Sequence, residues 1–519
     1  MTTGPQPAVR WEPLIVGVLL AFALAVRLVG LGSAPNGLFR DEWEKGYTAL
    51  ELWETGRHGV LGPEGVRVSY PVPLFIEVFA GHDRTSSTYQ WLAAPVVGIF
   101  GLEAWSTRLP AALTGFATVL LLWWSARRWL GAVGAVAVLG FLAVQPTHVL
   151  FSRWAQQGIV SIALASAGVV GMLIAIQAAG ARRRLTAIGA GLLMGLAAWA
   201  YDPVRLTLPL AFVMWAGLLG FWRHREATLA AGVAFLCLWL PLAAFTLTAG
   251  SGRLGRVLST GDGAALQFVL NYLAHFDPRF WFVSGDLNPR HALPLAGWSG
   301  RVTGLLALVG LLMVGRDALR NRKLEEWSLM GAALLLCGPV AAALTREGIP
   351  HALRSGLMIP GVVMLAGFAV SRLAELYGGR AAGMALAAAL LIDGATTTAG
   401  VLRLREPSPA WESGVIETLR AVALKPGPVH LSSEVMYAPY AALFAGRTDP
   451  ARFQEFGLAA GPIVLVQPGS QPVGGTLVAP PRPPLRLEWT SFTVMAYRAD
   501  GRYAWSDEAR QLVQLEPND

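Results

Sequence analysis

A cluster of charged and aromatic residues directly follows the first apolar segment of the chain. The apolar run extends from Trp11 to Leu31, and the cluster from Phe39 to Tyr47 contains three carboxylates, an arginine and a lysine. Charge beside a bilayer is costly to desolvate and usually marks a functional site, although Arg, Lys and Trp also anchor helix ends. A carboxylate such as Asp41 can deprotonate an attacking hydroxyl. The stretch therefore indicates either acid–base chemistry at a membrane surface or interfacial anchoring.

Arginine and histidine recur in the segments that separate the later apolar runs. The planar fork of arginine binds phosphate oxygens in pairs, so a substrate with a phosphate or diphosphate is one explanation, and interfacial anchoring is the other. The candidate phosphate ligands are Lys45, Arg153, Arg205, Arg290, His291 and Arg354. Further candidates, for acceptor binding or loop order, are Tyr70, His148, Asp202, Asp286 and His351.

The composition excludes an ordinary soluble protein. Of 519 residues, 54% are hydrophobic and 14% are charged, whereas a soluble domain has about 25% charged residues. The net charge of +8 is not a nucleic-acid signal, because the basic residues form short clusters between apolar runs. Cys237 and Cys337 lie inside apolar runs, which indicates small core residues and not a disulfide or a metal site. We therefore expect membrane lipids, and no nucleic acid, among the partners.

The elements that must position these residues are membrane helices, each of which needs about 20 mainly apolar residues. About eleven segments meet this rule: 11–31, 107–126, 130–146, 157–178, 186–201, 206–221, 227–249, 298–315, 327–345, 356–372 and 381–397. The first lacks a small-residue cleavage site, which favours a retained helix over a signal peptide. The sequence predicts an α-helical polytopic membrane protein.

Basic clusters predict the orientation of these helices. If the runs alternate, the amino terminus and five basic clusters share one side: 127–128, 182–184, 223–225, 316–323 and 372–380. The positive-inside rule makes this side the cytoplasm. We therefore expect a multi-pass protein of the cell (inner or plasma) membrane, with a cytoplasmic amino terminus.

The segment from Tyr70 to Gly101 is predicted to be interfacial or re-entrant. It contains three prolines, and its longest clean apolar run is too short to span. Counting it as a crossing would also place the arginines at 127–128 outside. The outer side then holds a long first loop (about 32–106), a second long loop (about 250–297) and everything after about residue 400.

The chain changes character after Leu404. Strand-like runs occur at Pro428–Ser432, Pro462–Val466 and Leu485–Tyr497, with a helix expected at Pro409–Ala423 and a turn or linker at 479–484. The expected domains are a membrane module over residues 1–403 and a small extracytoplasmic α/β domain over residues 404–519.

The order of these features resembles the GT-C type of membrane glycosyltransferase, and in particular the protein O-mannosyltransferases and the bacterial lipid A aminoarabinose transferases. Asp41 and Glu42 after the first helix, followed by an interfacial helix, are similar to the first outer loop of that family. Further similar segments are Arg108–Leu113, His148–Arg153, Ser284–His291 and His351–Arg354. The resemblance covers roughly residues 11–400.

The resemblance implies an enzyme that passes a hexosyl or pentosyl group from a polyprenyl-phosphate carrier to a hydroxyl of a protein, lipid or glycan on the outer side of the membrane. It implies that Asp41 is the general base, with inversion at the anomeric carbon, and that Glu42 supports it by position or by metal contact. Many relatives have an acidic residue where this chain has Gln156 and Gln157. The departure leaves the metal ligands unknown and the need for a divalent metal open.

Two other functions compete with this one. A transporter or flippase of a lipid-linked sugar or another anionic solute would typically show internal repeats and charges at mid-membrane. The sequence shows no clear repeat, and its polar residues gather outside the apolar runs. A non-catalytic scaffold would leave the charged cluster around Asp41 without a role. The pattern therefore favours the glycosyltransferase, with the transporter as the alternative.

Overall fold

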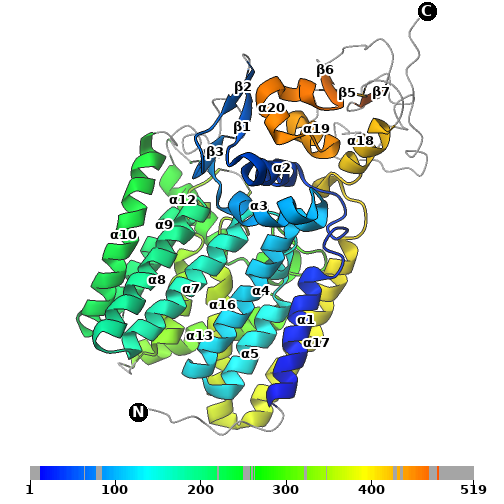
Figure 1. Ribbon diagram of the computed structural model, residues 1–519. Helices are drawn as coiled ribbons and strands as arrows, with labels where there is room; N and C mark the ends of the chain where they lie inside the picture. The colour runs from blue at the N-terminus through cyan, green and yellow to red at the C-terminus, as the bar shows by residue number, and fades with distance from the viewer. Residues whose placement is uncertain are drawn as a thin grey trace, which may run out of the picture. The chain divides into compact units, whose positions relative to one another are not determined.

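The computed structural model describes residues 12–62, 65–77, 84–218, 221–248, 258, 261, 263–320, 324–346, 348–424, 429–432, 437–466 and 476–478. Contacts divide the chain into two units, and most of the helices and strands are labelled in Figure 1. The helical unit comprises Met1–Val29, Ala111–Arg153 and Gln157–Val401. The mixed unit comprises Gly30–Pro110, Trp154–Gln156 and Leu402–Asp519. Each unit is described by itself.

Apolar helices make up the helical unit, because a chain in lipid must satisfy its peptide groups within its own segments. They are α1 (Glu12–Leu28), most of α4 (Ala104–Trp129), α5 (Gly131–Val144), α6 (Pro146–Phe151), α7 (Gln157–Gln177), α8 (Gly180–Ala200), α9 (Val204–Leu218), α10 (Arg225–Thr248), α12 (Ala264–Ala274), α13 (Arg301–Leu319), α14 (Glu326–Cys337), α15 (Val340–Ala343), α16 (Met358–Tyr377) and most of α17 (Gly379–Arg403). A 3-10 turn, η1 (Phe221–Arg223), and a π-helical turn, η2 (Phe280–Ser284), join them.

Every apolar segment expected from the sequence coincides with helix, and the multi-pass membrane architecture is confirmed. Among the described residues, seven helices are long and apolar enough to cross a membrane: α4, α7, α10, α13, α14 with α15, α16 and α17. The helices α5, α9 and α12 are apolar but shorter. A helix of 14 residues, such as α5, is about 21 Å long, less than the roughly 30 Å of a hydrocarbon core. The number of about eleven crossings therefore stays a prediction.

Glycines let several helices of this unit approach closely, as small residues do in membrane bundles. A Cβ on Gly191 of α8 would lie 2.1 Å from the Ala231 carbonyl oxygen of α10. A Cβ on Gly310 of α13 would lie 2.3 Å from the Leu365 carbonyl oxygen of α16. Both contacts are with backbone, so a larger residue at either position would push the two helices apart.

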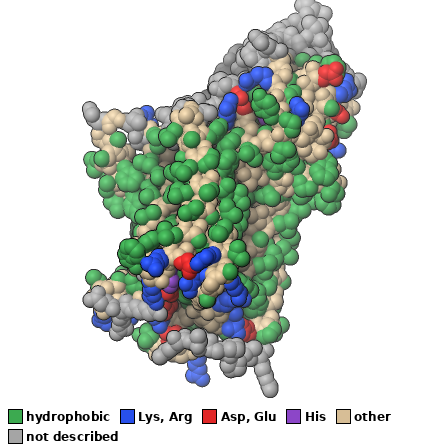
Figure 2. All heavy atoms as spheres, turned by 60° about the vertical axis from the view of Figure 1, so that its left-hand side comes forward, with side chains coloured by type: hydrophobic (Ala, Val, Ile, Leu, Met, Phe, Trp, Pro, Cys, Tyr) green, Lys and Arg blue, Asp and Glu red, His purple; other side chains and the backbone are tan. Residues whose placement is uncertain are grey.

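Basic side chains gather at one end of the helical unit, the lower end in Figure 2. Ion pairs connect helix ends there: Arg127–Glu12, Arg184–Glu226, Arg223–Glu326 and Arg372–Glu325. These arginines belong to four of the five basic clusters that the sequence placed on one side. The assignment of that end to the cytoplasm stays a prediction.

Short strands and helices make up the mixed unit. They are α2 (Arg40–Thr55), β1 (Gly59–Gly62), β2 (Gly65–Val68), β3 (Phe75–Glu77), β4 (Arg84–Ser86), α3 (Thr88–Phe100), η3 (Pro409–Trp411), α18 (Val415–Ala423), β5 (Val429–Ser432), α19 (Ala438–Gly446), α20 (Pro450–Phe456), η4 (Gly457–Ala460), β6 (Ile463–Val466) and β7 (Thr476–Val478). The strands β1 and β2, like β3 and β4, form an antiparallel pair. A parallel sheet has the order β6-β5-β7.

This grouping differs from the expected division at residue 403, in which the first outer loop was counted with the membrane module. The reason is the packing of α2, which contacts α3, α19 and α20, while β2 contacts α20. The first outer loop and the carboxyl-terminal segment thus share one core. The strands β5 and β6 lie where strands were expected, and η3 with α18 covers the expected helix. The strand expected at 485–497 and the linker at 479–484 lie outside the described residues.

Candidate functional site

The first turn of α2 carries the charged cluster that opens the outer loop. Phe39 precedes the helix in an extended conformation (φ −66°, ψ 147°), and the Glu42 carboxylate accepts a hydrogen bond from the Phe39 amide at 3.0 Å. The Glu42 side chain thus satisfies one of the amides that a helix start leaves unpaired. Gly56 ends the helix at φ 66°, a left-handed conformation that glycine adopts without strain.

Each oxygen of the Glu42 carboxylate accepts two hydrogen bonds. Its two oxygens accept hydrogen bonds from Arg108 Nε and Nη2 at 2.8 and 2.9 Å, from the Ala155 amide at 2.8 Å and from the Phe39 amide. Both Glu42 and Arg108 are 0% exposed. A metal ion at Glu42 would have to displace these donors, so the geometry does not fit a metal-binding role. Glu42 instead holds the start of α2 in place.

Arg108 uses all five of its N–H donors. Beyond the two bonds to Glu42, it donates to the carbonyl oxygens of Leu31, Pro35 and Gly37. The loop before α2 is therefore fastened to the same guanidinium as the helix. Such a buried pair is stable only when every donor and acceptor is matched, and here they are.

Arg40 binds Glu412, which lies 372 residues later in the chain. Its backbone amide donates to Glu412 Oε2 at 2.8 Å, and its guanidinium forms an ion pair with the same carboxylate. Glu412 is 5% exposed. Burial raises the pKa of Glu412 to about 7, against the opposing effect of Arg40 beside it. The nearby charge of Asp41 contributes in the same direction as burial.

This pKa predicts a pH dependence of stability. Because folded Glu412 binds its proton more tightly than an unfolded glutamate with a pKa near 4.5, the free energy of unfolding should fall as the pH rises from 4.5 to 7 and then level off. The variant Glu412→Gln, which cannot titrate, is expected to flatten this part of the curve. Thermal unfolding at a series of pH values checks it, with the exposed Glu406→Gln as control. An unchanged slope in Glu412→Gln would contradict the assignment.

Glu44 and Lys45 are buried within a polar network of the same helix. Glu44 Oε1 accepts from Gln90 Nε2 at 3.0 Å, and Lys45 Nζ lies 3.6 Å from Glu44 Oε2. Lys45 also donates to the Asp41 carbonyl oxygen, one helical turn earlier, at 3.3 Å. Burial raises the pKa of Glu44. Lys45 is 5% exposed, so a phosphate would have to displace these contacts to reach it.

Asp41 differs from all of its neighbours. Its side chain is half-buried, and within the described part of the chain no group donates a hydrogen bond to its carboxylate or pairs with it. It lies in the first turn of α2, where the helix dipole favours a negative charge. The four charged neighbours Arg40, Glu42, Glu44 and Lys45 all bind other protein groups. The Asp41 carboxylate, in contrast, has no partner among the described residues.

The candidate residues Arg153 and His148 lie inside the helical unit. Arg153 is 0% exposed and donates to the carbonyl oxygens of Val26 and Val29, at the end of α1. His148 is also 0% exposed, and its Nδ1 lies 2.9 Å from Arg27 Nη2. These contacts describe a helix cap and a buried hydrogen bond, not open ligand groups.

Arg205 and Tyr70 occupy different surroundings. Arg205 forms an ion pair with Asp202 at 2.6 Å and donates to Thr246 Oγ1 at 3.0 Å. Tyr70 is 88% exposed.

The loops before α13 and α16 bring together three residues that the sequence had singled out separately. His291 Nδ1 lies 3.2 Å from Asp286 Oδ2, and His351 Nδ1 lies 3.8 Å from the same oxygen. The rings of His291 and His351 stack with their centroids 4.7 Å apart. Burial lowers the pKa of both histidines, and the charges of Arg290 and Arg354 lower it further. Both imidazoles are therefore neutral near pH 7, beside two half-buried arginines.

Sequence reasoning missed several residues that fix these positions. Arg108 was noted only for its resemblance to a family segment, although an arginine at the start of an apolar helix is itself a signal. Glu412, 372 residues from its partner Arg40, carries no local signal. Asp393, inside the apolar run of α17, is 0% exposed and accepts from the amides of residues 301–303 at the start of α13. An aspartate in an apolar run could have been flagged.

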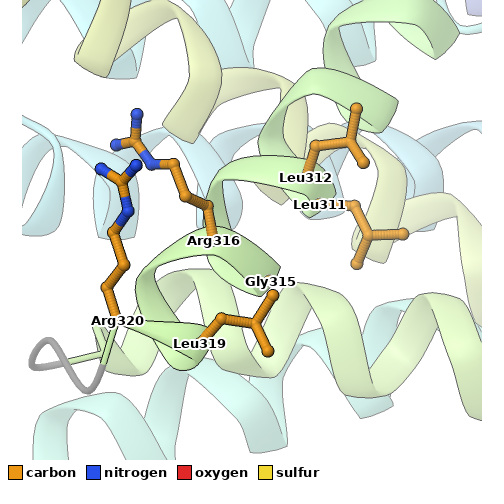
Figure 3. Close-up of a pocket in the computed structure, with 6 residues that line it drawn as sticks. All are labelled: Leu311, Leu312, Gly315, Arg316, Leu319 and Arg320. Atoms are coloured by element: carbon orange, nitrogen blue, oxygen red, sulfur yellow. The ribbon is translucent and has the colours of Figure 1, made fainter.

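A pocket of about 490 Å³ lies elsewhere in the helical unit (Figure 3). All of its lining residues belong to the last turns of α13 and the residue after it: Leu311, Leu312, Gly315, Arg316, Leu319 and Arg320. They lie in the second half of this helix and just after it, about 15–28 Å along the helix from Arg301 at 1.5 Å per residue. With leucines on one side and guanidiniums on the other (Figure 3), it has the character of a lipid-facing helix surface and not of a reaction chamber.

Comparisons with known proteins agree with the expected resemblance. A family model described as dolichyl-phosphate-mannose-protein mannosyltransferase matches residues 86–245. Among solved structures, apo ArnT from Cupriavidus metallidurans is 17% identical with a TM-score of 0.57, over 92% of this chain and 94% of ArnT. ArnT bound to undecaprenyl phosphate is 16% identical with a TM-score of 0.57, over 93% and 95%. No curated protein matches.

A more distant structure has the same type of fold. The archaeal oligosaccharyltransferase AglB from Archaeoglobus fulgidus, in complex with an inhibitory peptide and a dolichol-phosphate, is 14% identical with a TM-score of 0.50, over 88% of this chain and 64% of AglB. The resemblance to GT-C membrane glycosyltransferases is confirmed: the chain has their fold.

Proposed function

We propose that this protein is a membrane glycosyltransferase that moves a hexosyl or pentosyl group from a polyprenyl-phosphate donor to a hydroxyl of a lipid, glycan or protein on the outer face of the membrane. The observation that carries the proposal is Asp41, whose carboxylate has no partner among the described residues, in a cluster whose other charges are bound. The GT-C fold and the match to the mannosyltransferase family model support it. A structural neighbour that was solved with undecaprenyl phosphate supports the donor class.

The chemistry requires one base. The acceptor oxygen attacks the anomeric carbon, Asp41 takes the hydroxyl proton, and the bond from that carbon to the phosphate oxygen breaks with its electron pair. Polyprenyl phosphate leaves as an anion, so no second carboxylate is needed to protonate it. A single displacement inverts the anomeric carbon. Glu42 is then a positioning residue, since its four hydrogen bonds hold the turn that carries Asp41.

Arg290 and Arg354 are the donor-phosphate ligands in this proposal. Both are half-buried in the helical unit, whereas Arg153 and Lys45 are fully engaged and Arg205 is paired with Asp202. Asn288 Oδ1 accepts from Arg290 Nε at 3.3 Å. Thr345 Oγ1 accepts from Arg354 Nη1 at 2.7 Å. The planar, charged fork of an arginine suits the oxygens of a phosphate.

Replacement of either arginine should weaken use of the donor. For Arg290→Ala and Arg354→Ala we expect the KM for the polyprenyl-phosphate sugar to rise about 10-fold each, the equivalent of one charge-assisted hydrogen bond. Initial rates at varied donor concentration check this, with the exposed Arg403→Ala as control. An unchanged KM in both variants would remove these arginines from the donor site.

Purified protein in liposomes tests the function itself. The proposal expects label from a polyprenyl-phosphate sugar to appear in a new glycosidic bond on the acceptor. Movement of the labelled carrier across the bilayer without such a bond would instead favour the transporter. Since the acceptor is open, envelope lipids, glycans and proteins are supplied together and the labelled product is then identified.

A further inference from the structure

We propose that Asp286, His291 and His351 bind one divalent transition-metal ion, with Zn²⁺ as the ion that this ligand set suits best. One ligand atom from each residue lies within 4.8 Å of the other two. Metal–ligand bonds of about 2.0–2.2 Å place two ligands of a tetrahedral shell about 3.4 Å apart. The distances of 3.2 and 3.8 Å from Asp286 Oδ2 to the two histidine nitrogens bracket this value.

Backbone amides from two different loops hold the Asp286 carboxylate in position. Asp286 Oδ1 accepts from the Asn288 amide at 2.8 Å, and Oδ2 accepts from the Ala352 amide at 2.8 Å. The first bond belongs to a turn within the loop before α13, and the second joins this loop to the loop before α16. Asp286 is 4% exposed. These two hydrogen bonds hold its carboxylate oxygens in position.

A further histidine, His275, binds the backbone of the loop before α16. His275 Nδ1 donates to the Asn271 carbonyl oxygen at 2.8 Å, so its Nε2 accepts the hydrogen bond from the His351 amide at 3.1 Å. His275 is 0% exposed. Outer groups that orient ligands in this way are typical of metal sites.

The hydrogen bonds inside the cluster are long for the groups involved. Asp286 to His291 measures 3.2 Å, and the Arg354 amide donates to His351 Nδ1 at 3.3 Å, whereas charge-assisted bonds are about 2.7–2.9 Å. The stacked imidazoles are buried, with exposed fractions of 7% and 8%. A metal ion would replace these weak bonds with three strong ones.

The ligand set selects the class of ion. Two imidazoles and one carboxylate suit Zn²⁺ and its first-row neighbours, whereas Ca²⁺ and Mg²⁺ prefer oxygen ligands. Three protein ligands leave a fourth position open. The positive charges of Arg290 and Arg354, which act on both histidines, favour an anion in that position. The bound ion would tie the two loops together, whatever reaction the protein performs.

Metal content measured on the full-length protein tests this site. Protein in detergent is stripped with a chelator, reloaded with ZnCl₂ or CoCl₂, desalted and assayed for metal per chain. We expect about one ion per wild-type chain, and at least 10-fold weaker binding in His291→Ala, His351→Ala and Asp286→Asn. Bound Co²⁺ should also give the visible absorption of a nitrogen- and oxygen-ligated ion. His224→Ala, at the basic end of the helical unit, should bind as wild type does.

Two results would overturn the site. One is a wild-type chain that retains no metal after reloading, and the other is a set of ligand variants that retain as much as wild type. Size-exclusion profiles and metal-free thermal unfolding establish that each variant is folded. Where an alanine variant does not fold, His291→Gln and His351→Gln preserve side-chain volume and polarity, and the same comparison then decides.

Discussion

The variant Asp41→Asn is expected to lower glycosyl transfer by roughly 10²–10⁴-fold, the usual contribution of a general base, without loss of folded protein. The fold should survive because no described group bonds to the Asp41 carboxylate. Asparagine keeps the size of the side chain and removes only its ability to accept a proton. The measurement is the transfer of label from a polyprenyl-phosphate sugar by wild type and variant, matched for protein amount and for thermal unfolding.

A second acidic residue of α2 provides the control. Glu54 is exposed on the same helix, so Glu54→Gln removes one negative charge without touching the first turn and should leave transfer unchanged. Full activity of Asp41→Asn would remove Asp41 as the base. Equal losses in both variants would point to a general effect of charge.

The variant Arg108→Ala is expected to destabilise the protein by about 3–5 kcal/mol, as the removal of one partner from a buried ion pair does. It leaves the Glu42 carboxylate without its ion partner and the carbonyl oxygens of Leu31, Pro35 and Gly37 without the guanidinium donors. The thermal midpoint in detergent should fall by on the order of 10 °C. Exposed Arg57→Ala, from the same unit, should have little effect.

A double-mutant cycle separates the ion pair from the loop contacts. If Glu42 and Arg108 depend on each other, the double variant Arg108→Ala/Glu42→Ala should be less destabilised than the two single changes added together. Arg108→Lys keeps the charge but cannot reproduce five directed N–H donors, so it should remain clearly less stable than wild type. Strict additivity in the cycle would contradict the proposed coupling.

Much of the architecture could be predicted from the sequence. Long apolar runs must become helices in lipid, because only internal hydrogen bonds can satisfy their peptide groups. The expected segments accordingly all contain helix, and the arginines of four basic clusters form ion pairs between helix ends at one end of the helical unit. The strands β5 and β6 lie in the short strand-like runs that the sequence predicted. These features depend on local composition and periodicity, which a sequence displays directly.

The sequence by itself also indicated either acid–base chemistry or interfacial anchoring in the stretch after the first helix, but it could not distinguish the two adjacent carboxylates. Only the tertiary structure shows that Glu42 binds Arg108, 66 residues away, and that Arg40 binds Glu412, 372 residues away. No described residue binds the Asp41 carboxylate. The tertiary structure also brings His351 to Asp286 from another loop. Side-chain partners at such separations are set by the packing of whole elements. No local pattern encodes that packing, which binds Glu42 to Arg108 and leaves the neighbouring Asp41 without a partner among the described residues.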